Sequence, residues 1–137
     1  MELADTSAWT NRHKDRDVLR DFQERLVRGE IATCAMVRLE LLFSTKDVTE
    51  FRGRRDRLSA LRDVPIRPDV WERATDVFEL LASAAPLHHR RVKLPDLVIA
   101  ATAELAEIAV CHYDADFETI AAVTGQPVRM IAPLGSL

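Results

Sequence analysis

Five acidic residues stand where a carboxylate is costly unless it has a partner: Asp5, Glu40, Asp96, Asp114 and Asp116. Asp5 follows the short apolar run 1–4, and Asp114 follows the run 110–113. Glu40 interrupts an apolar helical stripe, and Asp96 opens a helical segment that is almost free of charge. Carboxylates that outnumber nearby bases repel one another, and a divalent cation relieves that repulsion. The acids therefore point to a metal site if the fold brings them together.

Four of these acids also have a structural explanation. Asp5 and Asp114 could be the N-caps of the helices that follow them, because a short carboxylate accepts hydrogen bonds from the free N–H groups of a helix start. Asp96 and Asp116 lie in the first turns of predicted helices, where negative charge suits the helix dipole. Taken alone, each is explained at least as well by helix capping as by metal binding.

Glu40 is harder to explain by its local sequence. The predicted inward face of its helix consists of Met36, Leu39 and Phe43. Glu40 shares that face, because residues three and four apart lie together on a helix. A carboxylate among apolar side chains is costly unless it is paired. The alternative to a cation is a salt bridge with an arginine such as Arg38 or Arg91.

The elements that must position the acids alternate between short apolar strands and helices. The predicted strands are Leu3–Ala4, Ile31–Cys34, Val64–Ile66, Val110–His112 and Val128–Ile131. The predicted helices are Asp17–Arg28, Ala35–Thr45, Asp47–Leu61, Pro68–Ala84, Pro95–Ile108 and Asp114–Thr124. Such alternation is typical of an α/β domain with a parallel sheet. We expect a single domain over residues 1–137, with three α/β/α layers and a short parallel sheet of about four to five strands.

This architecture predicts where the acids meet. The carboxyl ends of parallel strands lie at one edge of the sheet, and ligands bind there. Asp5 and Asp114 directly follow predicted strands, whereas Glu40 and Asp96 lie in early turns of helices that start at that edge. Mg²⁺ and Mn²⁺ prefer such oxygen ligands. A metal held there could activate water and neutralise charge that develops on a phosphate, so no nucleophilic side chain is needed.

Composition and charge narrow the setting. The chain is 47% hydrophobic and 30% charged, with a net charge of −3, as in ordinary globular proteins. No apolar run approaches the ~20 residues of a membrane span, and no basic region opens a secretory signal. We therefore expect a cytoplasmic protein without membrane contact.

Cys34 and Cys111 stand apart from each other, which excludes a zinc knuckle and indicates buried reduced thiols.

Basic residues are concentrated in two clusters. One comprises Arg52, Arg54, Arg55 and Arg57, and the other lies in the predicted loop Ala85–Lys93 and comprises His88, His89, Arg90, Arg91 and Lys93. Such runs are most often solvated surfaces. The alternative is a rim that contacts nucleic-acid phosphates.

Four motifs, taken together and in order, resemble a known family. They are "LADTSAW" around Asp5, "RLELLF" around Glu40, "LPDLVIAATA" around Asp96 and "HYDADFETIA" around Asp114. Each is weak alone, but their order and spacing over the whole chain are similar to those of PIN-domain ribonucleases. The resemblance is closest to the VapC toxins of toxin–antitoxin pairs.

The resemblance implies an endoribonuclease that depends on Mg²⁺, with Mn²⁺ as the alternative, and cleaves structured RNA such as tRNA or ribosomal RNA. It implies a catalytic set of Asp5, Glu40, Asp96 and Asp114, and a metal-binding set of Asp5, Asp96, Asp114 and Asp116. Thr6 or Ser7 would support the first aspartate, and both are also candidate helix caps. Arg90, Arg91 and Lys93 would contact RNA.

The resemblance also implies protein partners. VapC toxins form homodimers and sometimes larger assemblies, and a VapB-type antitoxin covers the toxin and sends a basic side chain into the acidic site. Candidates for an antitoxin groove or a dimer surface are Trp9, Leu42, Phe43, Phe51 and Leu58, and core packing is the alternative for each. His112 is expected as a strand-end histidine exposed to the cleft, or less readily as a metal ligand.

Other readings fit the residues less well. A haloacid-dehalogenase-like phosphatase needs an aspartate two residues after the nucleophile, where this chain has Ser7. A receiver-like module needs paired acids after the first strand and a lysine on the last, where Val128–Ile131 carries only Arg129. A catalytically silent PIN-like scaffold for RNA or protein would be marked by lost acids, yet all are present.

Overall fold

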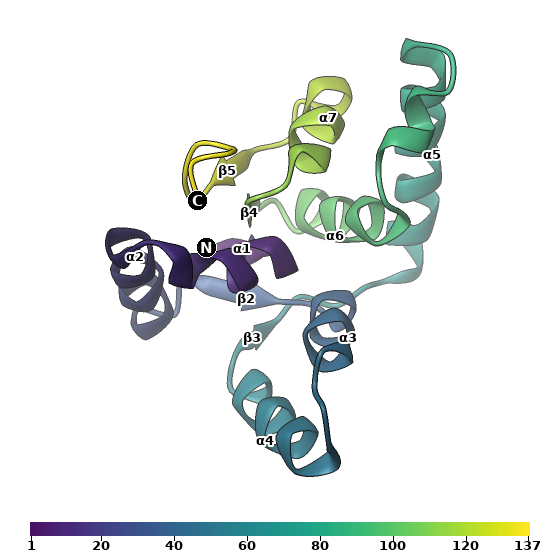
Figure 1. Ribbon diagram of the computed structural model, residues 1–137. Coiled ribbons are helices and arrows are strands. Elements are labelled where there is room, and N and C mark those ends of the chain that lie inside the picture. The colour runs from purple at the N-terminus through teal and green to yellow at the C-terminus, as the bar shows by residue number, and fades with distance from the viewer.

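Five short parallel strands form one sheet in the computed structural model, which describes residues 1–137 (Figure 1). The strands are β1 (Glu2–Ala4), β2 (Ile31–Thr33), β3 (Arg62–Asp63), β4 (Ala109–His112) and β5 (Val128–Met130). Their order across the sheet is β3-β2-β1-β4-β5, and every pair is parallel. The α/β fold with a short parallel sheet, expected from the sequence, is confirmed.

The strand order places a topological switch beside the central strand. From β1 the chain continues to β2 and β3 on one side, whereas β4 continues to β5 on the other side. β1 and β4 are paired directly, with Ala4 opposite Cys111. Open α/β sheets bind ligands outside the carboxyl ends of the strands at such a switch point, so the ends of β1 and β4 are where a site is expected.

Helices cover the sheet on both sides. The α-helices are α1 (Thr6–Asn11), α2 (Arg16–Val27), α3 (Ala35–Phe43), α4 (Val48–Ser59), α5 (Pro68–Ala84), α6 (Leu94–Leu105) and α7 (Ala115–Thr124). In Figure 1, α2 lies on one side of the sheet, and α5, α6 and α7 lie on the other. None of these helices is both long and apolar enough to cross a membrane.

Local sequence explains where the helices start and stop. Asp15 caps α2 by accepting hydrogen bonds from the backbone of the first turn, and Pro68 lies at the start of α5, where a missing N–H costs nothing. Gly125 ends α7 with φ at 72°, a left-handed conformation that glycine adopts without strain. These signals place most boundaries within two residues of the sequence prediction.

Three local predictions need correction. The third strand is Arg62–Asp63 rather than 64–66, because Pro65 lacks the N–H that a longer ladder would need. The basic loop contains a 3-10 turn, His88–Arg91. The segment Pro133–Leu137, which its sequence predicts to be a loose tail, is held at its end, since the Leu137 N–H donates a hydrogen bond to the Tyr113 hydroxyl at 2.9 Å.

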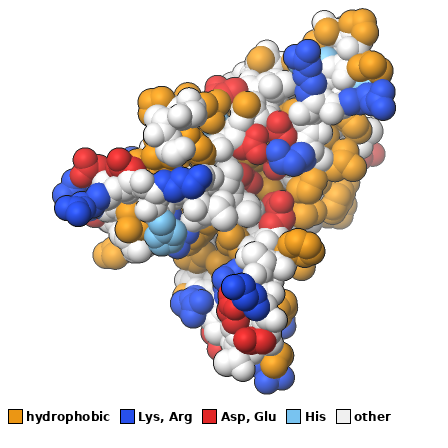
Figure 2. All heavy atoms as spheres, in the orientation of Figure 1, with side chains coloured by type: hydrophobic (Ala, Val, Ile, Leu, Met, Phe, Trp, Pro, Cys, Tyr) orange, Lys and Arg blue, Asp and Glu red, His pale blue; other side chains and the backbone are white.

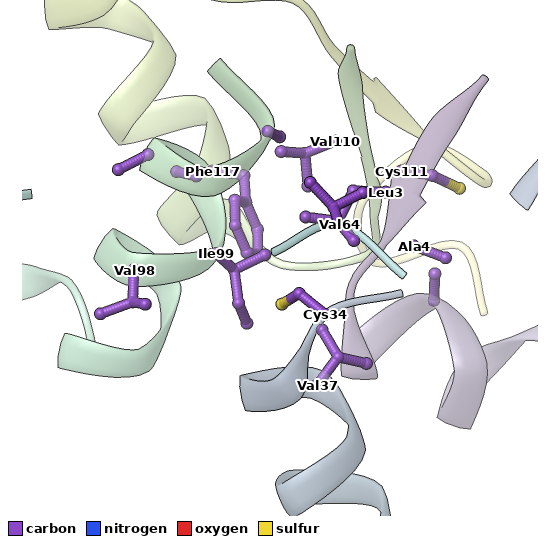
Figure 3. Packing of buried hydrophobic residues seen from close by; sticks show 14 of the residues in the cluster. Leu3, Ala4, Cys34, Val37, Val64, Val98, Ile99, Val110, Cys111 and Phe117 are labelled. Carbon is purple, nitrogen blue, oxygen red and sulfur yellow. The ribbon is translucent and has the colours of Figure 1, made fainter. Parts of the chain in front are cut away.

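The core joins the central strands to the helices on both sides. Figure 3 shows Leu3, Val110, Ile99 and Phe117 packed together, and all four are fully buried. Cys34 and Cys111 are buried free thiols, as predicted. This core holds the ends of β1 and β4 in fixed positions. Asp5 and Asp114 follow these two strand ends.

The inward face of α3 differs from the sequence prediction. Val37 and Leu41 are buried, whereas Leu39 is 63% exposed and Phe43 is 91% exposed. The prediction of Leu39 and Phe43 as inward residues was therefore wrong, whereas Met36 is half-buried and packs against the core as predicted. The helix is apolar on two stripes, so periodicity alone could not say which stripe meets the core.

Candidate metal centre and active site

Five acids from four parts of the chain meet outside the carboxyl ends of β1 and β4. Asp5 follows β1, Glu40 lies in α3, Asp96 lies in the first turn of α6, and Asp114 and Asp116 begin α7. Figure 2 shows red acidic side chains near the middle of one face, with a blue basic side chain among them and hydrophobic side chains close by. The predicted convergence of the acids is present in the structure.

Asp5 is held rigidly by its helix start. It is 3% exposed and caps α1, where its Oδ2 accepts hydrogen bonds from the backbone N of Ser7 at 2.9 Å and from Ser7 Oγ at 2.6 Å. Ser7 Oγ in turn accepts the N–H of Tyr113 at 2.9 Å, which ties the ends of β1 and β4 together. The other oxygen, Oδ1, is buried without a hydrogen-bond partner. Burial raises the pKa of Asp5 despite these hydrogen bonds.

The cap of α1 is Asp5 itself, not Thr6 or Ser7. Thr6 supports a different acid, because its Oγ1 donates a hydrogen bond to Glu40 Oε1 at 3.0 Å. Of the two hydroxyls predicted to support the first aspartate, Ser7 therefore contacts Asp5, whereas Thr6 contacts Glu40. Because these hydroxyls follow Asp5 by one and two residues, the first turn of α1 holds two carboxylates in place, those of Glu40 and Asp5.

No base pairs with Glu40. Arg38 donates to Asp63 instead, and Arg91 forms no ion pair, so the predicted alternative of an arginine salt bridge was wrong. Burial, followed by the nearby Asp5 carboxylate, raises the pKa of Glu40 against the hydrogen bond from Thr6. A carboxylate in this setting is costly to ionise, which favours proton exchange or a cation.

Asp96, Asp114 and Asp116 form the tightest group of acids. One carboxylate oxygen from each lies within 4.8 Å of the others. Asp96 is 3% exposed, and its Oδ2 has no hydrogen-bond partner. Burial and the adjacent Asp116 carboxylate raise the pKa of Asp96 to about 8. Although burial opposes it, hydrogen bonds from the backbone of Lys93 and from Asp96 hold the pKa of Asp116 below its usual range.

One base reaches these three acids. The Lys93 ammonium lies 2.8 Å from Asp114 Oδ2, 3.0 Å from Asp116 Oδ2 and 3.4 Å from Asp96 Oδ2. Although burial opposes it, hydrogen bonds to Asp114 and Asp116 raise the pKa of Lys93. Lys93 therefore contacts the acid group directly, unlike Arg90 and Arg91, which are exposed on the preceding turn and form no ion pair.

His112 is fully buried, so the prediction of a cleft-exposed histidine was wrong. Its Nδ1 accepts the N–H of Asp114 at 3.1 Å, its Nε2 lies 3.0 Å from Glu118 Oε1, and its ring packs against Phe117. Burial lowers the pKa of His112. His112 thus positions the backbone of an acid, a role that the spacing His-x-Asp could have suggested.

The donor set suits a hard divalent cation. Asp5 Oδ1 is a buried oxygen without a hydrogen-bond partner. Asp96 Oδ2 is buried too, and its one base is the Lys93 ammonium at 3.4 Å. Such atoms are costly unless a cation meets them. All the available donors are carboxylate oxygens, which Mg²⁺ and Mn²⁺ prefer, and no soft ligand competes. The residues that could hold the ion are Asp96, Asp114 and Asp116, with Asp5 beside them.

A separate cavity of about 530 Å³ lies away from the acids. Its apolar lining consists of Trp9, Leu26, Leu41, Leu58 and Leu61, and its basic lining includes Arg12, His13, Arg54 and Arg57. Trp9 and Leu58 are nearly buried yet border this cavity, whereas Phe43 is exposed elsewhere. Two of the five candidate docking residues therefore line one common groove.

The whole acid set falls within a match to a known family model. That model is the PIN domain, and it matches residues 3–123. This chain belongs to the PIN-domain family. Ribonuclease VapC18 of Mycobacterium tuberculosis is 42% identical to it over 133 residues, which cover 97% of this chain and 96% of that protein. Ribonuclease VapC21 of the same species is 42% identical over 113 residues, covering 80% of this chain and 78% of that protein. Within the PIN-domain family, the chain therefore belongs with the VapC proteins.

Solved structures share this PIN-domain fold. A toxin–antitoxin complex from Klebsiella pneumoniae aligns with a TM-score of 0.71 and 20% identity, covering 96% of this chain and 98% of that one. DNA-bound VapBC from Salmonella typhimurium aligns with a TM-score of 0.71 and 16% identity, covering 96% of this chain and 100% of that one. The resemblance seen in the four sequence motifs is thus confirmed for both family and fold.

Proposed function

We propose that this VapC protein is the toxin of a toxin–antitoxin pair and acts as a divalent-metal-dependent endoribonuclease on structured RNA. The observation that carries the proposal is the convergence of five acids with only one base among them. A fold that merely capped its helices would not need a buried carboxylate oxygen without a partner, such as Asp5 Oδ1. The names of the relatives, ribonucleases, support the same activity.

The residues have distinct roles in this proposal. Asp5, Asp96, Asp114 and Asp116 hold the metal, and Ser7 fixes the orientation of Asp5. A bound divalent ion would supply positive charge at the scissile phosphate and lower the pKa of the reacting water. Glu40 is half-buried, and burial raises its pKa, so its carboxyl is the candidate of this group for taking up or releasing a proton during the reaction.

RNA cleavage by the purified, antitoxin-free protein tests the proposal. Total tRNA and ribosomal RNA would be incubated with Mg²⁺ or Mn²⁺, with a chelator, and with the Asp96→Asn variant. We expect discrete fragments that require both the metal and Asp96. Because water attacks, the fragments should carry 5′-phosphate and 3′-hydroxyl ends. Ends with a 2′,3′-cyclic phosphate would contradict the mechanism, since they require attack by the ribose 2′-hydroxyl.

A catalytically silent scaffold is the second candidate. Metal binding without cleavage of any RNA, by a folded protein, would favour it over the nuclease. The intact acid set weighs against a scaffold, because selection for binding alone does not require costly buried carboxylates.

The antitoxin is proposed to dock in the groove between α1, α2 and α4. Apolar side chains with an arginine rim suit an acidic amphipathic segment of the partner. Arg57→Glu, which reverses a charge in the lining, should weaken antitoxin binding by about tenfold in a calorimetric titration. Arg52→Glu is the matched control, because Arg52 is exposed on the same helix outside the groove.

A homodimer is also part of the proposal. The exposed apolar side chains of Leu39 and Phe43 on α3 lie next to Glu40, where a second copy could cover them. Light scattering on the purified protein would show a dimer mass, and Phe43→Ser should shift the mass towards that of the monomer.

A further inference from the structure

Lys93 is the only base within ion-pair distance of the acid group. Its ammonium contacts one oxygen each of Asp96, Asp114 and Asp116, at distances between 2.8 and 3.4 Å. Asp5 and Glu40, on the other half of the group, have hydroxyl and backbone donors but no base. The positive charge that the protein itself supplies is therefore confined to one half of the site.

The three acids that Lys93 contacts are also the three whose oxygens come within 4.8 Å of one another. An ammonium and a divalent ion on the same oxygens would lie a few ångströms apart, where their charges repel strongly in a partly buried site. The two cations therefore compete. We propose that Lys93 is a built-in cation that stabilises the metal-free site and must leave its carboxylates when a divalent ion binds, so that it sets the metal affinity. The inference rests on the proposed metal-dependent function.

The backbone of Lys93 is held in place, whereas its side chain is free to move into solvent. Its backbone N–H donates to Asp116 Oδ2 at 2.9 Å, and the residue forms the N-cap of α6, so its main chain is held in place. Its side chain, however, is 60% exposed. A long flexible stem of this kind can move its ammonium into solvent without disturbing the fold. Once displaced, the same ammonium stays beside the site, where it could meet an RNA phosphate.

Direct Mn²⁺ titration of the RNA-free protein tests the inference. Isothermal calorimetry would compare the wild type with Lys93→Gln, Lys93→Arg and Arg91→Gln. Arg91→Gln is the matched control, because it removes one positive charge two residues away from a side chain that forms no ion pair. We expect Lys93→Gln to bind Mn²⁺ at least about tenfold more tightly, and the other two variants to remain close to the wild type.

Thermal unfolding in chelator supplies a second readout. Lys93→Gln should melt below the wild type, because three carboxylates lose their compensating charge, and Mn²⁺ should raise its melting temperature more than that of the wild type. A third measurement uses only the wild-type protein, so it does not depend on the stability of any variant. Mg²⁺ added to the wild type should move the side-chain ¹⁵Nζ resonance of Lys93 to the position of a solvated lysine.

The outcomes separate the inference from the proposed function. Equal or weaker Mn²⁺ binding by Lys93→Gln, or a Lys93 resonance unmoved by Mg²⁺, would overturn the competition while leaving a metal-dependent nuclease intact. Failure of every variant and of the wild type to bind Mn²⁺ would overturn the metal-dependent function, and the inference with it.

Discussion

The two ends of the central strand deal with a buried carboxylate in opposite ways. Glu2, at the start of β1, is 8% exposed and is paired with two arginines: Arg25 Nη1 at 2.8 Å and Arg129 Nε at 2.7 Å. Asp5, directly after the end of β1, is 3% exposed and has no base at all. Only two residues, Leu3 and Ala4, separate Glu2 from Asp5 in the sequence.

The difference separates structural charge from functional charge. At Glu2, each carboxylate oxygen has a guanidinium partner, so the charge is satisfied within the protein. At Asp5, the neighbours are other acids, and one oxygen is buried without a partner. Burial alone therefore does not mark a functional acid, whereas burial among other acids does.

The largest effect should come from neutralising the unpaired end. Asp5→Asn keeps the size and the helix cap but removes a charge from the metal site. We expect RNA cleavage to fall by at least about a thousandfold, because the ion and the phosphate charge are no longer stabilised. The melting temperature in chelator should not fall, since one of several repelling carboxylates is gone. A clear loss of stability in Asp5→Asn would show instead that the Asp5 charge is satisfied within the protein, as the Glu2 charge is.

Neutralising the paired end should have the converse result. Glu2→Gln leaves Arg25 and Arg129 without their shared carboxylate and should lower the free energy of unfolding by about 2 kcal/mol. In a thermal melt this corresponds to roughly 8 °C for a domain of this size. Cleavage per folded molecule, measured well below the melting temperature, should be retained. Loss of cleavage in the fully folded variant would contradict the structural role of Glu2.

A smaller effect on cleavage is expected from removing the Ser7 hydroxyl, which contacts Asp5 where a base is absent. Ser7→Ala removes the Oγ that joins Asp5 to the backbone of Tyr113. Cleavage should fall by about 10- to 100-fold, because the carboxylate is less well oriented. Thr10→Ala, one helical turn further along α1, is the control and should leave cleavage unchanged, since Thr10 bonds only to backbone carbonyls. Equal losses in both variants would indicate damage to α1 rather than misplacement of Asp5.

The smallest expected effect is a change of the melting temperature with pH. The folded protein raises the pKa of Asp96 from 3.8 to about 8, so it binds this proton more tightly than the unfolded chain does. That contribution to stability is complete at low pH and is lost as pH rises through the folded pKa. In chelator, the melting temperature should fall by a few degrees between about pH 7 and 8.5.

His112 does not interfere in this pH range. Its pKa is lowered by folding, so it makes stability rise with pH, and only below its unfolded pKa of 6.5. Asp96→Asn should flatten the dependence, and so should saturating Mn²⁺, which excludes the proton from the site. An unchanged slope in Asp96→Asn would assign the effect to other groups.

The sequence by itself determined the elements and the members of the acid group. Helix caps, Pro68, Gly125 and the apolar periodicity act over a few residues, so most strands and helices could be placed along the chain. The exceptions are the short helix α1 and the third strand. The four motifs around Asp5, Glu40, Asp96 and Asp114 identified the family, because together they combine local residues in a fixed order and spacing. A parallel sheet then implied that the acids meet.

The tertiary structure alone decided how each charge is satisfied. Glu2 meets Arg129 from the far end of the chain, and Lys93 meets Asp114 across a separate element, so neither pairing is visible in any local pattern. The inward stripe of α3 and the burial of His112 were also decided there. Side-chain pairing and burial depend on which distant surfaces come into contact, and local periodicity carries no information about that contact.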